Sequence, residues 1–131
     1  MDAAHVKDLA CWQLANELKV AVYAVVATPD VERDRNFCYD LKHAARSAPA
    51  SIAEGFGRAT HREFARFLTI ARASLVEAEQ HLQHLHDQNL VPFEEWIRMV
   101  DLAQRAQRAA SALRTYLMRT PNHRHGDGSR R

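Results

Sequence analysis

The sequence predicts an all-α protein: an antiparallel up-down four-helix bundle in residues 1–118, followed by a disordered basic tail in residues 119–131. Apolar residues recur at helical spacing in four separate segments. Turn signals separate these segments, and the whole chain has only four glycines and four prolines, which disfavours a loop-rich or β fold. Four helices of about 20–30 residues with short connections form such a bundle naturally.

The first helix is predicted over residues 6–27. One apolar stripe runs along it, formed by Ala10, Leu14, Leu18, Ala21, Val22 and Val25. Proline cannot continue a helix, so Thr28-Pro29-Asp30 should end this one.

A second apolar face lies beside that stripe and carries Trp12, Val20 and Tyr23. The last helix has similar surplus apolar residues, including Phe93 and Ile97. Exposed apolar patches mark contact sites, so these five residues are predicted to meet a second subunit. The alternative is that a terminal segment of the chain covers them.

The second helix is predicted to start at Val31 or Arg33 and to run to Glu54. Pro49 lies inside it, where proline removes one hydrogen bond and costs about 3 kcal/mol in an unadapted helix. Because Ile52 stays in phase with Leu41, we expect one helix that is kinked at Pro49 rather than two helices.

The stretch from Gly55 to Glu63 is predicted to be a structural turn. Gly55 should end the second helix in a left-handed conformation, and Gly57 should clear the crossing to the third helix. Thr60 and Glu63 fit a capping box, in which each side chain accepts a hydrogen bond from the amide of the other residue. The alternative is a weak anion site, where free amides of the new helix combine with the nearby Arg58, His61 and Arg62.

The third helix should run from Thr60 to Gln88 or Asn89, with its apolar stripe formed by Phe64, Phe67, Leu68, Ala71, Leu75, Ala78, Leu82 and Leu85. The fourth should start with Pro92 in its first turn and end near Leu117. Its buried stripe is predicted to contain Trp96, Met99, Ala103, Ala106, Ala110, Leu113 and Leu117.

The net charge of the chain is only +2, but the charge is unevenly distributed. Residues 42–72 contain six Lys or Arg against two Glu, and residues 119–131 contain four Arg against one Asp. Such asymmetry can steer a polyanion to one side of a protein, although a solvated charged surface gives the same pattern. The candidate nucleic-acid-binding residues are Lys42, Arg46, Arg58, His61, Arg62 and Arg66.

Enzymatic chemistry has little support in the sequence. The glycines around Phe56 lack the spacing, the lysine and the preceding strand of a phosphate-binding loop. Glu77, His81, His84 and Gln88 share one helix flank, but no fourth ligand is evident, so a polar flank or subunit contact is favoured over a metal site. Glu54 is expected to cap a helix or to pair with Arg58. We expect no catalytic residue, no metal and no cofactor.

Cys11 and Cys38 form no disulfide framework and no metal motif, so both are expected to be reduced in a cytoplasmic protein. No secretory signal is evident, and the longest apolar run, residues 20–27, is too short to cross a bilayer. We therefore expect no membrane partner.

Three stretches resemble a known family: KDLACWQ (residues 7–13), RSAPASIAEGFGR (residues 46–58) and EFARFL (residues 63–68). The chain resembles, over residues 6–117, the four-helix-bundle proteins encoded in 23S rRNA intervening sequences, whose relatives include accessory variability proteins of diversity-generating retroelements. Ala50 departs from the pattern, which often has a polar residue there.

The resemblance implies an up-down bundle that assembles as a ring-like homopentamer without known enzymatic activity, and it carries no catalytic residue to this chain. It also implies a possible nucleic-acid or reverse-transcriptase partner, because retroelement relatives bind both. Two functions remain open: sequence-tolerant nucleic-acid binding through basic patches, and a scaffold that docks a partner protein, for example a reverse transcriptase.

Overall fold

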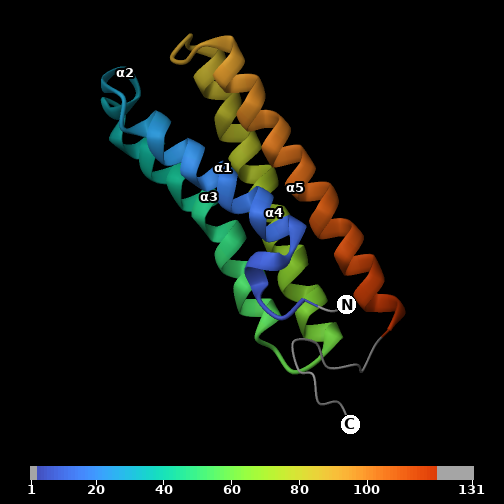
Figure 1. Cartoon of the computed structure of the whole chain (residues 1–131). Coiled ribbons are helices and arrows are strands. Elements are labelled where there is room, and N and C mark those ends of the chain that lie inside the picture. The colour runs from blue at the N-terminus through green and yellow to red at the C-terminus, as the bar shows by residue number, and fades with distance from the viewer. Residues whose placement is uncertain (1–2, 121–131) are drawn as a thin grey trace.

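The computed structural model describes residues 3–120, and all of its regular structure is helical, which confirms the all-α class. A single 3-10 turn, η1 (Val6–Asp8), precedes five α-helices (Figure 1). They are α1 (Ala10–Val26), the short α2 (Pro29–Glu32), α3 (Arg35–Phe56), α4 (His61–Asp87) and α5 (Phe93–Arg119). The disordered tail is predicted to start at residue 119, but α5 includes Arg119; residues 121–131 of that tail lie outside the described residues.

The four long helices lie side by side, and each packs against two of the others. The main contacts are α1 with α3 and α5, and α4 with α3 and α5. The α4–α5 connection and α2 lie at the upper end of Figure 1, whereas the α3–α4 turn lies at the lower end. No described helix has both the length and the apolar character needed to cross a membrane.

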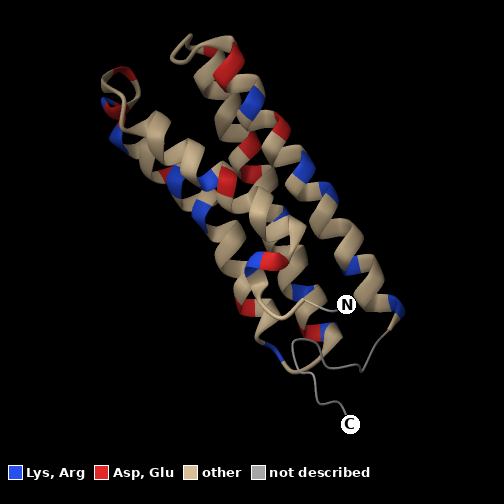
Figure 2. Ribbon diagram, in the orientation of Figure 1, with Lys and Arg blue, Asp and Glu red and all other residues tan. Residues whose placement is uncertain are grey.

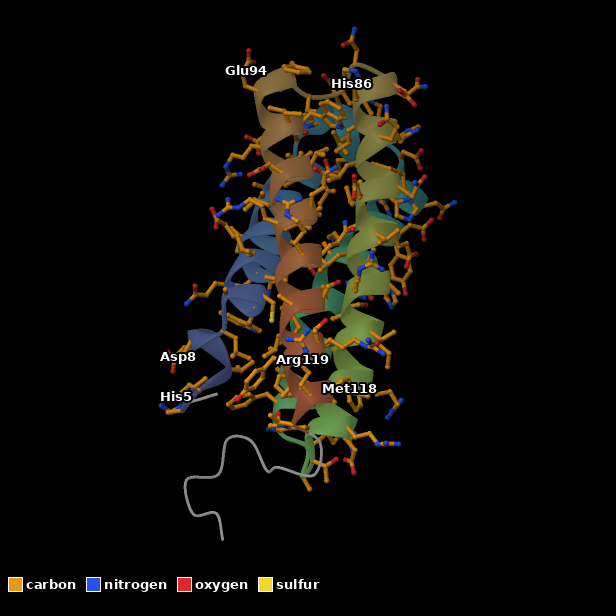
Figure 3. All side chains as sticks on the ribbon, turned by 90° about the vertical axis from the view of Figure 1, so that its right-hand side faces the viewer. His5, Asp8, His86, Glu94, Met118 and Arg119 are labelled. Atoms are coloured by element: carbon orange, nitrogen blue, oxygen red, sulfur yellow. The ribbon has the colours of Figure 1, made fainter. Side chains whose placement is uncertain are left out.

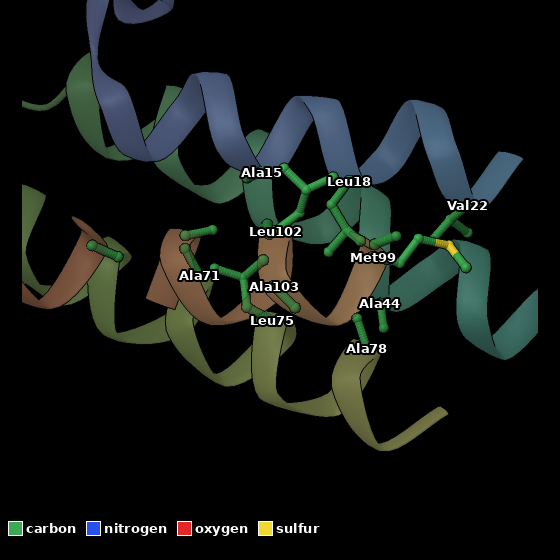
Figure 4. Packing of buried hydrophobic residues seen from close by; sticks show 14 of the residues in the cluster. Ala15, Leu18, Val22, Ala44, Ala71, Leu75, Ala78, Met99, Leu102 and Ala103 are labelled. Atoms are coloured by element: carbon green, nitrogen blue, oxygen red, sulfur yellow. The ribbon is translucent and has the colours of Figure 1, made fainter. Parts of the chain in front are cut away.

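The core lies along the centre, between the four long helices. Figure 4 shows side chains converging from all of them: Leu18 and Val22 from α1, Ala44 from α3, Leu75 from α4, and Met99 from α5. Many core positions are alanine, among them Ala71, Ala78, Ala103 and Ala106. Small side chains let the helix axes approach closely, which explains how a short chain buries a continuous core.

The first helix begins four residues later than predicted. Leu9 is in an extended conformation (φ −81°, ψ 132°), which separates η1 from α1, and its side chain is buried. Gln13 supports this break because its Nε2 donates a hydrogen bond to the carbonyl of Lys7 at 2.8 Å. The buried stripe includes Cys11 and Ala15, so the predicted position Ala10 is wrong, and it is exposed.

Two features, the short helix α2 and an N-cap at Asp34, replace the single break predicted before α3. Pro29 occupies the first turn of α2, where its missing amide costs little, and α2 buries Val31. The Asp34 carboxylate then accepts a hydrogen bond from the Phe37 amide at 3.1 Å and caps α3. Thus α3 starts at Arg35, slightly later than predicted.

The predicted roles of the two turn glycines are interchanged in the structure. α3 continues through Pro49 and Gly55 and ends at Phe56, so Gly55 does not end the helix. A Cβ atom on Gly55 would lie only 2.6 Å from the Phe67 Cβ and 2.8 Å from the Phe64 Cδ1. Gly55 therefore makes the close crossing with α4, whereas Gly57 caps α3 with φ −82°, which is not left-handed.

The start of α4 follows the prediction in part, with one of the two hydrogen bonds of the predicted capping box. Thr60 is the N-cap residue, and its hydroxyl accepts a hydrogen bond from the Glu63 amide at 3.2 Å. The helix ends at Asp87, and Asn89 then adopts φ 56°, a left-handed conformation that asparagine tolerates better than most residues. Pro92 is the N-cap of α5 rather than part of its first turn.

Both cysteines are buried and free. Burial raises the pKa of the Cys11 thiol from 9.0 to about 11. Burial also raises the pKa of Cys38, whose Sγ donates a hydrogen bond to the Val31 carbonyl at 3.2 Å. Both thiols are therefore packing groups rather than nucleophiles.

The crossing at Gly55 can be tested with a matched pair of alanine variants. Gly55→Ala should lower the free energy of unfolding by about 1–3 kcal/mol, because the new methyl group overpacks the contact with Phe64 and Phe67. Gly57→Ala should change it by less than about 1 kcal/mol, since its Cβ would meet no atom closer than 3.6 Å. Urea denaturation followed by circular dichroism measures both, and equal effects would contradict the assigned roles.

The buried thiols predict slow labelling and a loss of stability in alkali. At pH 8 only about one Cys11 in a thousand is a thiolate, so a thiol reagent should label the native protein far more slowly than the unfolded chain. The folded state holds its Cys11 proton more tightly, so the free energy of unfolding should fall as the pH rises above about 9. Rapid labelling of both thiols in native protein at pH 8 would refute their burial.

Candidate nucleic-acid interface

The six predicted basic residues do not form one patch. Lys42 and Arg46 lie on α3 where it faces α1, Arg58 lies in the α3–α4 turn, and Arg62 and Arg66 lie on α4 where it faces α5. Figure 2 shows Lys and Arg distributed over several elements, with Asp and Glu between many of them. The contacts of each group of basic residues therefore differ.

Lys42 and Arg46 line a cavity of about 530 Å³ between α1 and α3. The Lys42 Nζ lies 5.4 Å from the ring centre of Tyr23, and the Arg46 guanidinium lies 5.8 Å from that of Tyr39. Hydrogen bonding with Tyr23 raises the pKa of Arg46 above its ordinary value. Both cations thus lie against aromatic rings.

Arg58 is engaged by its own turn. Its guanidinium forms an ion pair with Glu54 at 2.7 Å and lies 4.8 Å from the centre of the Phe67 ring. The expected pairing of Glu54 with Arg58 is therefore confirmed. Because its charge is paired and its guanidinium plane lies near a ring, Arg58 is less free to bind an anion than an arginine without an ion pair.

His61 is not an exposed basic group. Its side chain is fully buried, and Nδ1 lies 2.7 Å from the Thr120 carbonyl oxygen and 2.9 Å from Thr120 Oγ1. The carbonyl can only accept, so Nδ1 donates, and the ring joins the start of α4 to the end of α5. The proposed anion cluster of Arg58, His61 and Arg62 is therefore not assembled, because only Arg62 is both exposed and without an ion pair.

Arg62 and Arg66 belong to a groove between α4 and α5 that contains three further arginines. Three adjoining cavities of about 350, 380 and 330 Å³ follow one another along these helices. The first and second share Thr69 and Arg114, and the second and third share Arg72 and Ser111. We call this surface the arginine groove and define it by Arg62, Arg66, Arg72, Arg108 and Arg114.

The arginines of the groove form no ion pair with any residue in the described range 3–120. Arg114 Nε donates a hydrogen bond to Thr69 Oγ1 at 2.8 Å, and Arg66 lies 4.7 Å from the centre of the Phe67 ring. These contacts orient two guanidinium groups without neutralising them. By contrast, Arg33, Arg58, Arg98 and Arg105 all pair with carboxylates.

The groove ends at a carboxylate whose oxygens are occupied. Glu79 accepts hydrogen bonds from Gln104 at 2.9 Å and from Gln107 at 2.7 Å, which joins α4 to α5. Figure 3 views the molecule from the side of α5, with His86 and Glu94 at one end and Met118 at the other. Met118 lines the end of the groove where Arg62 and Arg66 lie.

Three of the five groove arginines are absent from the predicted site. Arg72 is the last residue of the basic segment 42–72, and Arg108 and Arg114 lie on α5, outside that segment. Their sequence signal is only the presence of several arginines in the fourth helix. That signal becomes useful only when the α4–α5 register is known, because the register decides which arginines face each other.

The histidines of α4 contribute to packing. His84 lies 4.5 Å from the Phe37 ring centre, and His86 stacks on Trp96 at 4.2 Å. His81 lies 3.7 Å from the Glu77 carboxylate. Within residues 3–120 no three His, Cys, Asp or Glu side chains are grouped closely enough to hold a metal.

The predicted subunit-contact residues lie in different environments. Trp12 is half-buried against the core, and Tyr23 lines the cavity between α1 and α3. Tyr23 is also 40% exposed, and Val20, Phe93 and Ile97 are exposed with 59%, 56% and 43% of their surfaces accessible. Exposed apolar side chains of this kind are typical of surfaces that contact another molecule.

The comparisons with known proteins place this fold in a family. No curated protein matches the chain significantly. The family model described as 23S rRNA-intervening sequence protein matches residues 7–112, which include α1 to α4 and most of α5. Because this match covers most of the 131 residues, the chain belongs to the 23S rRNA-intervening sequence protein family.

Proposed function

We propose that this protein is a non-enzymatic, oligomeric binder of nucleic acid that recognises the phosphate backbone through the arginine groove. The observation that carries the proposal is the row of arginines without ion pairs in cavities that follow α4 and α5. Unpaired cations in a groove attract a polyanion and release its condensed counterions on binding.

The groove favours sequence-tolerant binding. Its lining consists of arginines, neutral polar side chains, aliphatic side chains and, at one end, the carboxylate of Glu79, with no aromatic ring among the lining residues. Guanidinium groups bind phosphate oxygens, which are the same in every sequence. RNA and DNA strands should therefore bind with similar affinity whatever their base order.

The proposal includes an assembly. The packing order of the long helices supports an antiparallel up-down four-helix bundle. Val20, Phe93 and Ile97 are exposed apolar residues that a second copy would cover, and a ring-like homopentamer is the form we propose. Five copies would repeat the arginine groove five times, so modest affinity per groove would be amplified by avidity.

The same apolar residues favour a second candidate function, a scaffold for a partner protein such as a reverse transcriptase. Phe93 contacts Trp96 and His86 by its ring, and together they place an aromatic cluster at the end of the molecule away from the basic end of the groove. Such clusters are common contact sites between proteins. A partner protein there and a nucleic acid in the groove would not compete.

Nucleic-acid binding should weaken when the groove loses charge. Arg62→Gln with Arg66→Gln should weaken binding of a single strand by about tenfold, and should reduce the magnitude of the salt slope by about 0.7 for each lost phosphate contact. Fluorescence anisotropy with a labelled oligonucleotide at several salt concentrations measures both quantities.

A matched control removes the same charge elsewhere. Arg33→Gln with Arg105→Gln also deletes two exposed guanidinium groups, but these pair with Asp30 and Asp101 outside the groove. Their loss should leave the affinity nearly unchanged. Equal weakening by both double variants, or no wild-type binding at low salt, would refute the groove as the binding surface.

The proposed pentamer has a defined mass, and replacing the exposed apolar residues should lower that mass. Five copies of the 14.9 kDa chain have a mass of about 75 kDa, and Phe93→Ser with Ile97→Ser should shift the population toward the monomer. Ile70→Ser is the control, because Ile70 is also exposed, at 39%, but lies outside the predicted contact set. Light scattering after gel filtration gives the masses, and a wild-type mass near 15 kDa would refute the oligomer.

A further inference from the structure

A second cavity has a different chemistry from the arginine groove. We call it the tyrosine pocket, and its polar lining consists of Tyr23, Glu32, Arg35, Tyr39, Lys42 and Arg46. It lies between α1 and α3, and its volume of about 530 Å³ is within the range of sites for small organic ligands. It shares no residue with the cavities of the groove.

The charges of the pocket favour an anion with about two negative charges. Arg35, Lys42 and Arg46 contribute three positive charges, and Glu32 contributes one negative charge. None of the three cations pairs with a carboxylate among the described residues. A terminal phosphate monoester carries about −1.5 to −2 at pH 7 and offers three acceptor oxygens, which matches this balance.

The rings supply the second recognition element. Tyr23 is 40% exposed and Tyr39 is 57% exposed, so both rings are accessible to a ligand. Each holds one cation near its ring, Lys42 at 5.4 Å and Arg46 at 5.8 Å. The cations are thereby positioned without being neutralised, and an aromatic base can contact the same rings.

The rest of the pocket lining is uncharged. It consists of Val26, Ala27 and Cys38. The Cys38 thiol is directed to the Val31 carbonyl by its hydrogen bond and stays protonated, since burial raises its pKa. A planar base can bury part of its apolar surface against these side chains, which favours binding.

We propose that the tyrosine pocket binds a nucleoside 5′-monophosphate unit, with its phosphate on Arg35, Lys42 and Arg46 and its base against Tyr23 and Tyr39. The unit can be a free nucleotide or the 5′-phosphorylated end of a single strand, because both present the same chemistry. This site is independent of the arginine groove, which recognises internal phosphates.

The chemistry can be tested with three small ligands in calorimetric titrations of the full chain at low salt. Adenosine 5′-monophosphate should bind at least about tenfold more tightly than adenosine, which lacks the phosphate, and than ribose 5-phosphate, which lacks the base. Equal affinity for the nucleotide and either fragment would overturn the proposal, as would no binding of the nucleotide at about 1 mM.

Two variants and a control assign the binding to the pocket. Arg46→Gln and Tyr39→Leu should each weaken nucleotide binding by about fivefold or more, and both residues are exposed, so the folded state should persist in circular dichroism. Arg62→Gln with Arg66→Gln should leave nucleotide binding unchanged. Full affinity in both pocket variants would overturn the assignment.

The source of the ligand is decided by oligonucleotides of one sequence with either a 5′-phosphate or a 5′-hydroxyl. In the protein with Arg62→Gln and Arg66→Gln, a preference for the 5′-phosphorylated strand identifies strand ends as the ligand. Binding of free nucleotide without that preference identifies the free nucleotide. The same variant distinguishes the two proposals. If it loses strand binding but still binds the free nucleotide, the tyrosine pocket is a site separate from the arginine groove.

Discussion

The contact between Gly55 and the two phenylalanines of α4 is the constraint on which the rest of the structure depends. With no side chain at Gly55, the α3 backbone can lie against Phe64 and Phe67 at distances that no Cβ would permit. The crossing fixes the direction in which α4 leaves the turn. Since α4 carries the arginines of one wall of the groove, and α5 packs along it, the position of the groove follows from this contact.

The two candidate sites differ in what positions their cations. In the arginine groove a hydroxyl, Thr69, and one ring, Phe67, orient Arg114 and Arg66. In the tyrosine pocket, rings lie beside both Lys42 and Arg46. Among the described residues no carboxylate forms an ion pair with these cations, although the chain contains 16 acidic residues and pairs four of its other arginines with them. Cations without such partners retain their affinity for anions.

The sequence predicted the helices well because helical spacing is a local signal. The Thr60 cap, the end of α4 and the continuous helix through Pro49 follow from residues within a few positions of each other. Contacts between distant segments could not be predicted in the same way. From the sequence, His61 is expected at the surface, but in the structure it is hydrogen-bonded to Thr120. Gly55 is expected to end a helix, but in the structure it packs against Phe67 inside the helix. The arginine groove depends on how α4 and α5 are aligned with each other. The spacing of residues within one helix does not predict that alignment.

The hydrogen bond between His61 and Thr120 fixes the rotation of α5 about its own axis relative to α4. The imidazole is fully buried, so the Thr120 carbonyl has to arrive at one place and in one direction. Adding or deleting one residue in α5 rotates everything after it by about 100° around the helix axis. Substitutions along the outer side of α5 would leave that alignment intact. The length of α5 is therefore under tighter constraint than its composition, and an insertion in it is a more severe change than most replacements.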